Sequence, residues 1–247
     1  MSARLLWLLL FCALNTTAAM AQTLSPLVPV DGSAANVWRF VGLPKSQADI
    51  PPTRFELATL QGERALKVST RASYGTWVHD LPSVKPGRLQ WRWRLDQALT
   101  GGKTKPDMFT KAGDDAALKV CVLFDHPLEH VPFVERTLLR MARRVSGEDL
   151  PAATLCYVWD SVYPAGTQGA NPYTQRVRFI NVQGKGAPLG QWQTESRDVA
   201  ADFAQLFADE LPQGAAVPSV RAVLIGADSD NTGAESVGWL KSLAWSP

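Results

Sequence analysis

The sequence of 247 residues predicts a mainly β protein, a β-sandwich of jelly-roll type with one or two short helices on its surface. Strand-like segments follow one another at intervals of about ten residues, and turn residues rather than helical periods separate them. One of these segments, Ala117–Phe124, is apolar on both faces except at Lys119. Such a pattern is typical of a strand that is covered on both sides.

The stretch Lys111–Asp125, KAGDDAALKVCVLFD, contains this segment and is the predicted centre of the fold. We expect its strand to lie beside Leu89–Asp96 and Thr154–Ser161. Turn and charged residues open the stretch, so that Asp114 and Asp115 come where loop meets strand. Functional side chains are often found at such junctions.

In Leu89–Asp96 polar and apolar residues alternate, so Trp91 and Trp93 share one face with two leucines. This pattern favours a core position for both rings, although a sugar-stacking platform is the alternative. Arg92 and Arg94 then point outward. Further strands are predicted over Asn36–Val41, Arg54–Thr59, Arg64–Thr70 and Thr76–Leu81.

The second half of the chain continues the pattern. In Thr154–Ser161 one face carries Leu155, Tyr157 and Trp159. Pro164–Pro172 is predicted to be a loop. Strands follow at Gln175–Val182, Val220–Ala227 and Glu235–Trp245, and Gln191–Arg197 leads into a helix over Asp198–Ala208 with Asp198 as its N-cap. Since we find no repeat and no linker, residues 22–247 are predicted to form one domain.

A second helix is predicted within Pro127–Ser146, where Val131, Val134, Leu138 and Met141 recur at helical spacing among arginines. Two interpretations are open. The helix packs on the sandwich, or it is a basic amphipathic helix that lies on a membrane surface.

The first 21 residues have the features of a signal peptide: Arg4, the apolar run Leu5–Leu14 and an Ala19-Met20-Ala21 cleavage site. We therefore expect an exported, periplasmic protein that starts at Gln22. We find no second hydrophobic segment long enough for a membrane helix. The formal net charge of +2 is close to neutral and argues against nucleic acid as a partner.

Beyond the leader the chain has two cysteines, Cys121 and Cys156, in strands that we expect to be neighbours. An oxidising compartment favours a disulfide between them. Two buried free thiols remain the alternative.

Two motifs suggest metals. His126-Pro-Leu-Glu-His130 fits the H-x-x-E-H pattern of some zinc peptidases, but Pro127 suits the first helical position and leaves His126 outside the helix. Asp228 and Asp230 follow an apolar strand. They are expected to bond their own backbone in a turn, with an isolated calcium site as the alternative. No other cofactor is expected.

Strand-end carboxylates offer a third kind of site. Asp114 or Asp115 could pair with Asp160 or Asp228 as in a glycosidase or lyase, provided that the fold sets the right separation. No serine or cysteine lies in a nucleophile elbow, and no glycine-rich phosphate loop follows a strand. These absences argue against a Ser-His-Asp enzyme and against nucleotide binding.

Five segments in order carry a resemblance: LQWRWRLD at Leu89, KAGDDAALKVCVLFD at Lys111, LCYVWD at Leu155, SRDVAADFAQLF at Ser196 and LIGADSDNTGA at Leu224. The chain resembles, over residues 36–245, the bacterial exported family catalogued as domain of unknown function 3047. The resemblance implies a β-rich exported domain without an established activity, so no functional residue is carried over. Lys119 departs from the arginine expected in that strand.

Two hypotheses of function follow. The first is a non-catalytic module that binds carbohydrate or a cell-envelope glycan, which the fold class, the leader and the nine tryptophans favour. The second is a polysaccharide-cleaving enzyme that uses a carboxylate pair. For the first, the candidate ligand-binding residues are Arg92, Arg94, Asp114, Asp115, Tyr157, Trp159 and Arg197.

Overall fold

The structure is a computed structural model that describes residues 24–27, 37–43, 47, 49–147 and 149–246. The predicted signal peptide and its cleavage site lie outside these residues. Within them, no helix combines the length and the apolar character needed to cross a membrane.

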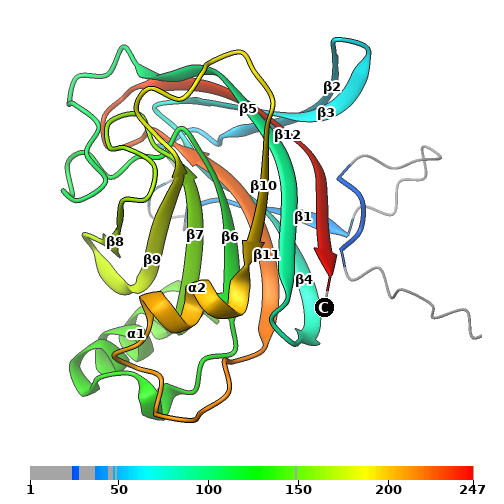
Figure 1. Cartoon of the computed structure of the whole chain (residues 1–247). Helices are drawn as coiled ribbons and strands as arrows, with labels where there is room; N and C mark the ends of the chain where they lie inside the picture. Colours follow the sequence, from blue (N-terminus) through cyan, green and yellow to red (C-terminus); the bar gives the residue numbers. More distant parts are fainter. Residues whose placement is uncertain (1–23, 28–36, 44–46, 48, 148, 247) are drawn as a thin grey trace, which may run out of the picture.

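Two β-sheets face each other (Figure 1). The seven-stranded sheet contains, from edge to edge, β1 (Trp38–Val41), β4 (Tyr74–Val84), β11 (Val220–Asp228), β6 (Leu118–Phe124), β7 (Ala153–Trp159), β9 (Thr174–Gln183) and β8 (Gln168–Asn171). The five-stranded sheet contains β10 (Gln193–Asp198), β5 (Arg88–Thr100), β12 (Glu235–Ser246), β3 (Glu63–Arg71) and β2 (Arg54–Leu60). Neighbouring strands are antiparallel except β7 and β9. The predicted mainly β sandwich is confirmed.

The tryptophans of β5 form the centre of the core between the sheets. The ring of Trp91 lies 5.2 Å from that of Tyr157, and the ring of Trp93 lies 5.4 Å from that of Trp159. All four side chains are buried. The core position predicted for Trp91 and Trp93 is therefore confirmed.

Of the two strands predicted to lie beside the central strand, one is confirmed and the other is wrong. β6 pairs with β7, as expected, but its other neighbour is β11, while β5 belongs to the opposite sheet. The alternation of polar and apolar residues shows which side chains of β5 point into the core. It does not show whether β5 lies beside β6 in the same sheet or faces it from the opposite sheet. The outer face of β6, turned away from the five-stranded sheet, is covered in part by Met108 and Ala116.

On this outer face Cys121 of β6 lies directly opposite Cys156 of β7, with the Cα atoms 4.0 Å apart. The two sulfur atoms form a disulfide in the structure. Val158 and Phe179 pack beside it. Of the two alternatives for these cysteines, the structure has the disulfide.

Two helices lie at one end of the sandwich (Figure 1). α2 (Val199–Leu206) begins at Asp198, whose side chain accepts a hydrogen bond from the Ala201 amide at 3.0 Å, as its predicted role as N-cap requires. The rings of Phe203 and Phe207 stack 4.7 Å apart and are buried. α1 (Phe133–Ser146) starts after Pro132 and ends at Gly147, which has a left-handed φ of 70°.

The H-x-x-E-H stretch does not form a helix turn that presents two histidines to one metal. Leu128–His130 is a single 3-10 turn, and Pro127 precedes it. His126 is buried against Phe203 and lies 3.3 Å from Glu210. In the described part of the chain, no group of three His, Cys, Asp or Glu side chains is placed to hold a metal ion.

The edge strand β8 falls in the predicted loop Pro164–Pro172. Its sequence, QGAN, has no apolar alternation that could indicate a strand. Gly169 is needed there because a Cβ atom would come within 2.4 Å of the Phe109 ring, which lies against β8. Tertiary packing therefore makes this segment a strand.

Candidate binding site

Three connections meet at the end of the sandwich away from α1. They are the turn at residues 72–73, the β5–β6 loop at 101–117 and the β11–β12 loop at 229–234. Backbone hydrogen bonds join them: the Lys103 amide donates to Thr232 O at 2.8 Å, and the Ser229 amide donates to Ser73 O at 2.9 Å. The polar side chains of these loops therefore share one region.

Asp115 holds two of these loops together. Its Oδ2 atom accepts hydrogen bonds from the amide of Thr232 at 2.8 Å and from the Thr232 hydroxyl, and Oδ1 accepts one from the Asn231 amide. The side chain is buried, and burial raises the pKa of Asp115. Asp115 therefore holds the two loops in position through both of its oxygens.

Asp228 is the partner of the one lysine in the central strand. Its Oδ2 accepts a hydrogen bond from Lys119 Nζ at 2.7 Å, and its Oδ1 accepts one from the Ala116 amide at 2.8 Å. Burial disfavours the charge on Lys119, but Asp228 and Tyr74 outweigh it, so the pKa of Lys119 is raised. The ammonium group stands where a cation bound to Asp228 would need to be, so the alternative of a calcium site at Asp228 and Asp230 is not supported.

Asp114 is the half-buried carboxylate of this cluster. Its Oδ2 accepts a hydrogen bond from Asn171 Nδ2 at 2.6 Å. Burial and the nearby charge of Asp228 raise the pKa of Asp114 to about 6. The pKa of Asp230 is also raised to about 6, first by burial and then by Asp228. Two carboxyl groups here therefore have a pKa of about 6.

A small cavity of about 50 Å³ opens between Asp114, Asn171, Lys119 and Asp228. Its floor is apolar and is formed by Met108, Cys156, Val158, Val177 and Phe179. A space of this size holds a few water molecules or one substituent of a larger ligand. A sugar ring would have to lie over the cavity rather than inside it.

Tyr173 is the exposed aromatic residue nearest in sequence to Asn171, and Lys111 Nζ lies over its ring at 5.3 Å from the centroid, which leaves the other ring face for a sugar. It follows Asn171 in the β8–β9 turn, and its side chain is 58% exposed. The Tyr173 amide donates to Asn171 Oδ1 at 2.9 Å, and its hydroxyl donates to Lys111 O at 2.9 Å. An exposed aromatic ring is thus held next to a carboxylate–amide pair. We name Asp114, Asn171, Tyr173, Lys119 and Asp228 the Asp114 site.

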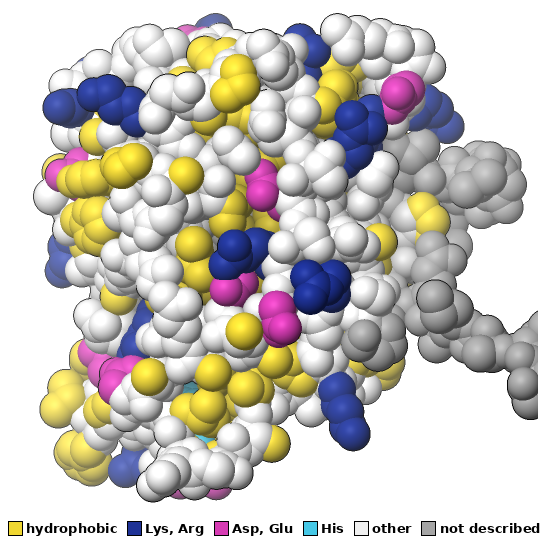
Figure 2. Space-filling view, in the orientation of Figure 1, with side chains coloured by type: hydrophobic (Ala, Val, Ile, Leu, Met, Phe, Trp, Pro, Cys, Tyr) yellow, Lys and Arg dark blue, Asp and Glu magenta, His cyan; other side chains and the backbone are white. Residues whose placement is uncertain are grey.

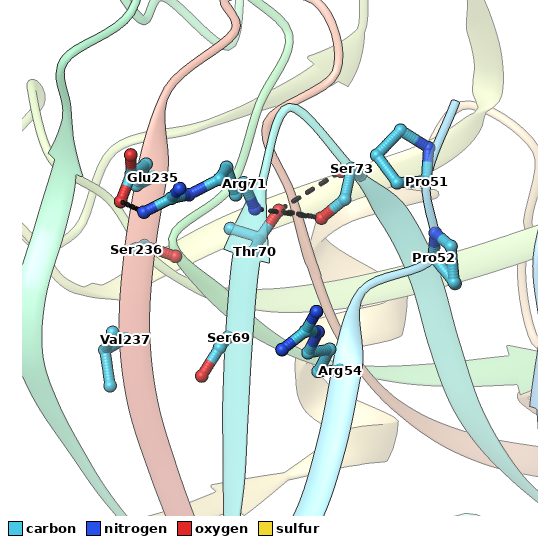
Figure 3. A pocket seen from close by; sticks show the side chains of 10 residues that line it. All are labelled: Pro51, Pro52, Arg54, Ser69, Thr70, Arg71, Ser73, Glu235, Ser236 and Val237. Atoms are coloured by element: carbon cyan, nitrogen blue, oxygen red, sulfur yellow. Dashed lines mark hydrogen bonds and ion pairs between the residues drawn. The ribbon is translucent and has the colours of Figure 1, made fainter. Parts of the chain in front are cut away.

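A larger pocket of about 470 Å³ lies between β2, β3 and β12 at the same end (Figure 3). Arg71 reaches across it to Glu235 at 3.1 Å, and the hydroxyls of Thr70 and Ser73 face each other at 2.7 Å. The Thr70 hydroxyl also lies 2.7 Å from that of Ser229. These polar groups are largely paired with one another, and the pocket offers two proline rings but no aromatic surface.

The other predicted ligand-binding residues do not join the Asp114 site. Arg92 and Arg94 lie on the outer face of the five-stranded sheet, where Arg94 pairs with Asp96. Tyr157 and Trp159 do not form an accessible surface, since both belong to the core; this part of the prediction is wrong because their face of β7 packs on β5.

Arg197 and Asp160 are also engaged elsewhere. Arg197 pairs with Asp202 at 2.5 Å, and the Tyr157 hydroxyl donates to the same carboxylate at 2.8 Å. Asp160 accepts hydrogen bonds from the amides of Val162 and Tyr163 through one oxygen. It therefore caps its own loop and does not form a pair with Asp114.

Asn171 and Tyr173 were missed by the sequence analysis. They lie in a segment without hydrophobic periodicity. Asn171 is 57 residues from Asp114 in the sequence. The sequence shows only a tyrosine after Asn171 and Pro172 of a predicted loop, and such a pattern by itself does not indicate a site.

The chain belongs to the family described as Protein of unknown function (DUF3047), whose model matches residues 36–244. No curated protein matches the sequence. Among solved structures, two mutants of CBM29-2, a family 29 carbohydrate-binding module, are similar to this chain. One, in complex with cellulohexaose, has 11% identity and a TM-score of 0.30, and the match covers 85% of this chain and 91% of that one. The other has 12% identity and a TM-score of 0.29 with the same coverage.

Proposed function

We propose that this member of the DUF3047 family is a non-catalytic binding module that holds a carbohydrate of the cell envelope at the Asp114 site. One observation carries the proposal: the exposed ring of Tyr173 is fixed beside the hydrogen-bonded pair Asp114–Asn171. Sugars present an apolar C–H face that stacks on aromatic rings and hydroxyl groups that pair with carboxylates and amides.

The hydrogen-bonding capacity of the site suits a sugar. Asn171 Nδ2 bonds to Oδ2 of Asp114, and the structure gives Oδ1 of Asp114 no hydrogen bond within the described residues. The Lys119 ammonium has three donors, of which one points to Asp228. A sugar hydroxyl or hydroxymethyl group fits the cavity of about 50 Å³ between these groups while its ring lies over Tyr173.

An exported location supports an envelope glycan as the ligand. The predicted signal peptide directs the chain out of the cytoplasm, and disulfides such as Cys121–Cys156 persist in oxidising compartments. We therefore place the protein in the periplasm as part of the proposal.

A polysaccharide-cleaving enzyme is the second candidate, and the raised pKa of Asp114, about 6, favours it. A general acid needs such a pKa, and Asp228, paired with Lys119, would be the second carboxylate. However, both oxygens of Asp228 already accept hydrogen bonds from the protein. These bonds hold Asp228 to the Ala116 amide and the Lys119 ammonium as part of the framework of the site. Binding without cleavage is therefore our first candidate.

The test is isothermal titration calorimetry with peptidoglycan fragments and with cello-, xylo- and chito-oligosaccharides. We expect one class to bind, with binding weakened at least about tenfold in Tyr173→Ala and in Asp114→Ala, since each removes a stacking or hydrogen-bonding partner. Leu189→Ala is the matched control, because Leu189 is 49% exposed and lies outside the site.

Three results would count against the proposal. Failure of every glycan class to bind contradicts carbohydrate binding. Binding that Arg54→Ala and Arg71→Ala abolish, but Tyr173→Ala does not, moves the site to the larger pocket. Shortened oligosaccharides in the calorimeter cell, detected by chromatography, favour the enzyme instead.

A further inference from the structure

α1 packs on the protein through one narrow face. Leu139 is buried in a small cluster with Val131 and Ala152. Arg143 donates to Leu150 O at 2.9 Å and 2.6 Å, and Arg136 donates to Leu128 O at 3.4 Å. These contacts fix which side of the helix faces the sandwich.

Within the described residues, the opposite side of α1 is apolar and exposed. At 100° per residue, Val134, Leu138, Met141 and Val145 fall within about 60° of one another and about 130° from Leu139. Their side chains are 66%, 55%, 58% and 89% exposed, and Phe133 at the start of the helix is 73% exposed. We name these five residues the apolar strip of α1. Figure 2 shows hydrophobic side chains gathered over α1 at the lower left of the molecule.

This concentration is unlike the rest of the surface. Of the eleven large hydrophobic side chains that are exposed in the described residues, the apolar strip holds five within one helix of 14 residues. A cluster of exposed apolar side chains of this kind is typical of an interaction site. Val134, Leu138, Met141 and Val145 follow the helix axis, and Phe133 lies at the N-terminal end of the strip, towards its arginine side.

Positive charge lies along one side of the apolar strip. On the same helical projection Arg140 and Arg144 fall within about 20° of Phe133, and both are exposed. The acidic neighbours Glu135 and Asp149 are directed to arginines: Glu135 lies 3.6 Å from Arg176, and Asp149 pairs with Arg143 and Arg221. The exposed side of α1 is therefore apolar in the middle and cationic at one edge.

We propose that α1 is an interfacial helix that docks the protein on the anionic phospholipid surface of a membrane. Apolar side chains on one face enter the boundary between headgroups and acyl chains, and arginines at the edge pair with anionic headgroups. This charge complementarity selects a lipid surface containing phosphatidylglycerol-type headgroups as the partner. Asp114 precedes β6 and α1 follows it, so the docked protein would hold the Asp114 site away from the membrane.

Vesicle co-sedimentation tests the proposal, with the full chain and vesicles of phosphatidylcholine alone or with one quarter phosphatidylglycerol. The test variant carries Val134→Ser, Leu138→Ser, Met141→Ser and Val145→Ser. The matched control carries Leu57→Ser and Leu189→Ser, which are 45% and 49% exposed elsewhere on the surface. A third variant, Arg140→Glu with Arg144→Glu, tests the charged edge.

We expect the wild type and the control to bind the anionic vesicles, and the four-serine variant to bind at least about tenfold more weakly. The arginine variant should lose most of its preference for anionic over neutral vesicles, and added salt should weaken wild-type binding. Any binding of the leader segment to the vesicles would be the same in all variants. A difference in vesicle binding between variants therefore reports on α1. Because every substituted side chain is exposed, all variants should keep the wild-type circular dichroism spectrum.

Equal binding of the wild type and the four-serine variant overturns the proposal, as does a wild type that binds neither kind of vesicle. A wild-type dimer that the four serines convert to a monomer, seen by light scattering without lipid, also overturns it. In that case the apolar strip is an interface between copies of this chain.

Discussion

Lys119 Nζ and Asp228 Oδ2 lie 2.7 Å apart, although the two residues are 109 positions apart in the sequence. Their side chains are 17% and 10% exposed. The pair joins the central strand β6 to the end of β11 and fixes the base of the Asp114 site. It also explains how an otherwise apolar strand accommodates a lysine.

Replacing Lys119 with methionine should lower the free energy of unfolding by about 3–5 kcal/mol, because Asp228 would remain as a buried charge without a counterion. Urea denaturation followed by tryptophan fluorescence measures the change. The double variant Lys119→Met with Asp228→Asn should lose clearly less, since it removes both charges. Losses that simply add would show that the two groups do not interact.

Asp114→Asn should stabilise the protein at neutral pH. The pKa of Asp114 is raised to about 6, so the ionised carboxylate is disfavoured in the folded state above that pH. The folded wild type takes up this proton as the pH falls from about 7 to about 5, before the unfolded chain does, and gains stability. We expect the variant to gain about 1–2 kcal/mol at pH 7.5, after allowing for partial solvent exposure, and almost nothing at pH 4.

Urea denaturation of both proteins at the two pH values checks this difference. A gain that is the same at pH 7.5 and pH 4 would mean that the titration of Asp114 is not its cause. Glycan binding should weaken in the same variant. A residue that lowers stability but serves binding would show this combination of effects.

Removal of the disulfide by Cys121→Ala with Cys156→Ala should cost about 2–4 kcal/mol, because the unfolded chain regains the freedom of a loop that spans 35 residues. Thermal denaturation with and without a reducing agent measures the effect. Reduction should lower the midpoint of the wild type towards that of the variant. If neither the reducing agent nor the double substitution changes the midpoint, the cysteines contribute as free thiols.

Tyr157→Phe should leave glycan binding unchanged and lower the free energy of unfolding by about 1–2 kcal/mol. The Tyr157 hydroxyl donates to Asp202 at 2.8 Å in the core, so its loss leaves a buried carboxylate with one partner fewer. Calorimetric titration and urea denaturation give the two quantities. If the variant binds glycan more weakly but unfolds with the same free energy, Tyr157 takes part in glycan binding.

The sequence alone determined most of the strands, the two helices and the N-cap at Asp198. It also determined which residues share a face, because alternation and helical period are local properties of the chain. Trp91 and Trp93 could therefore be assigned to the core, and Asp114 could be placed where loop meets strand. The family resemblance over residues 36–245 is likewise borne out by the match over residues 36–244.

Tertiary structure decided what each face meets. Local pattern did not reveal that β5 faces β7 from the other sheet, which buries Tyr157 and Trp159, or that QGAN becomes an edge strand. It also did not bring Asn171 to Asp114 or leave the apolar strip of α1 uncovered. Periodicity fixes the direction of a side chain relative to its own backbone, whereas its partners come from segments far away in the sequence, and these are set only when the whole chain packs.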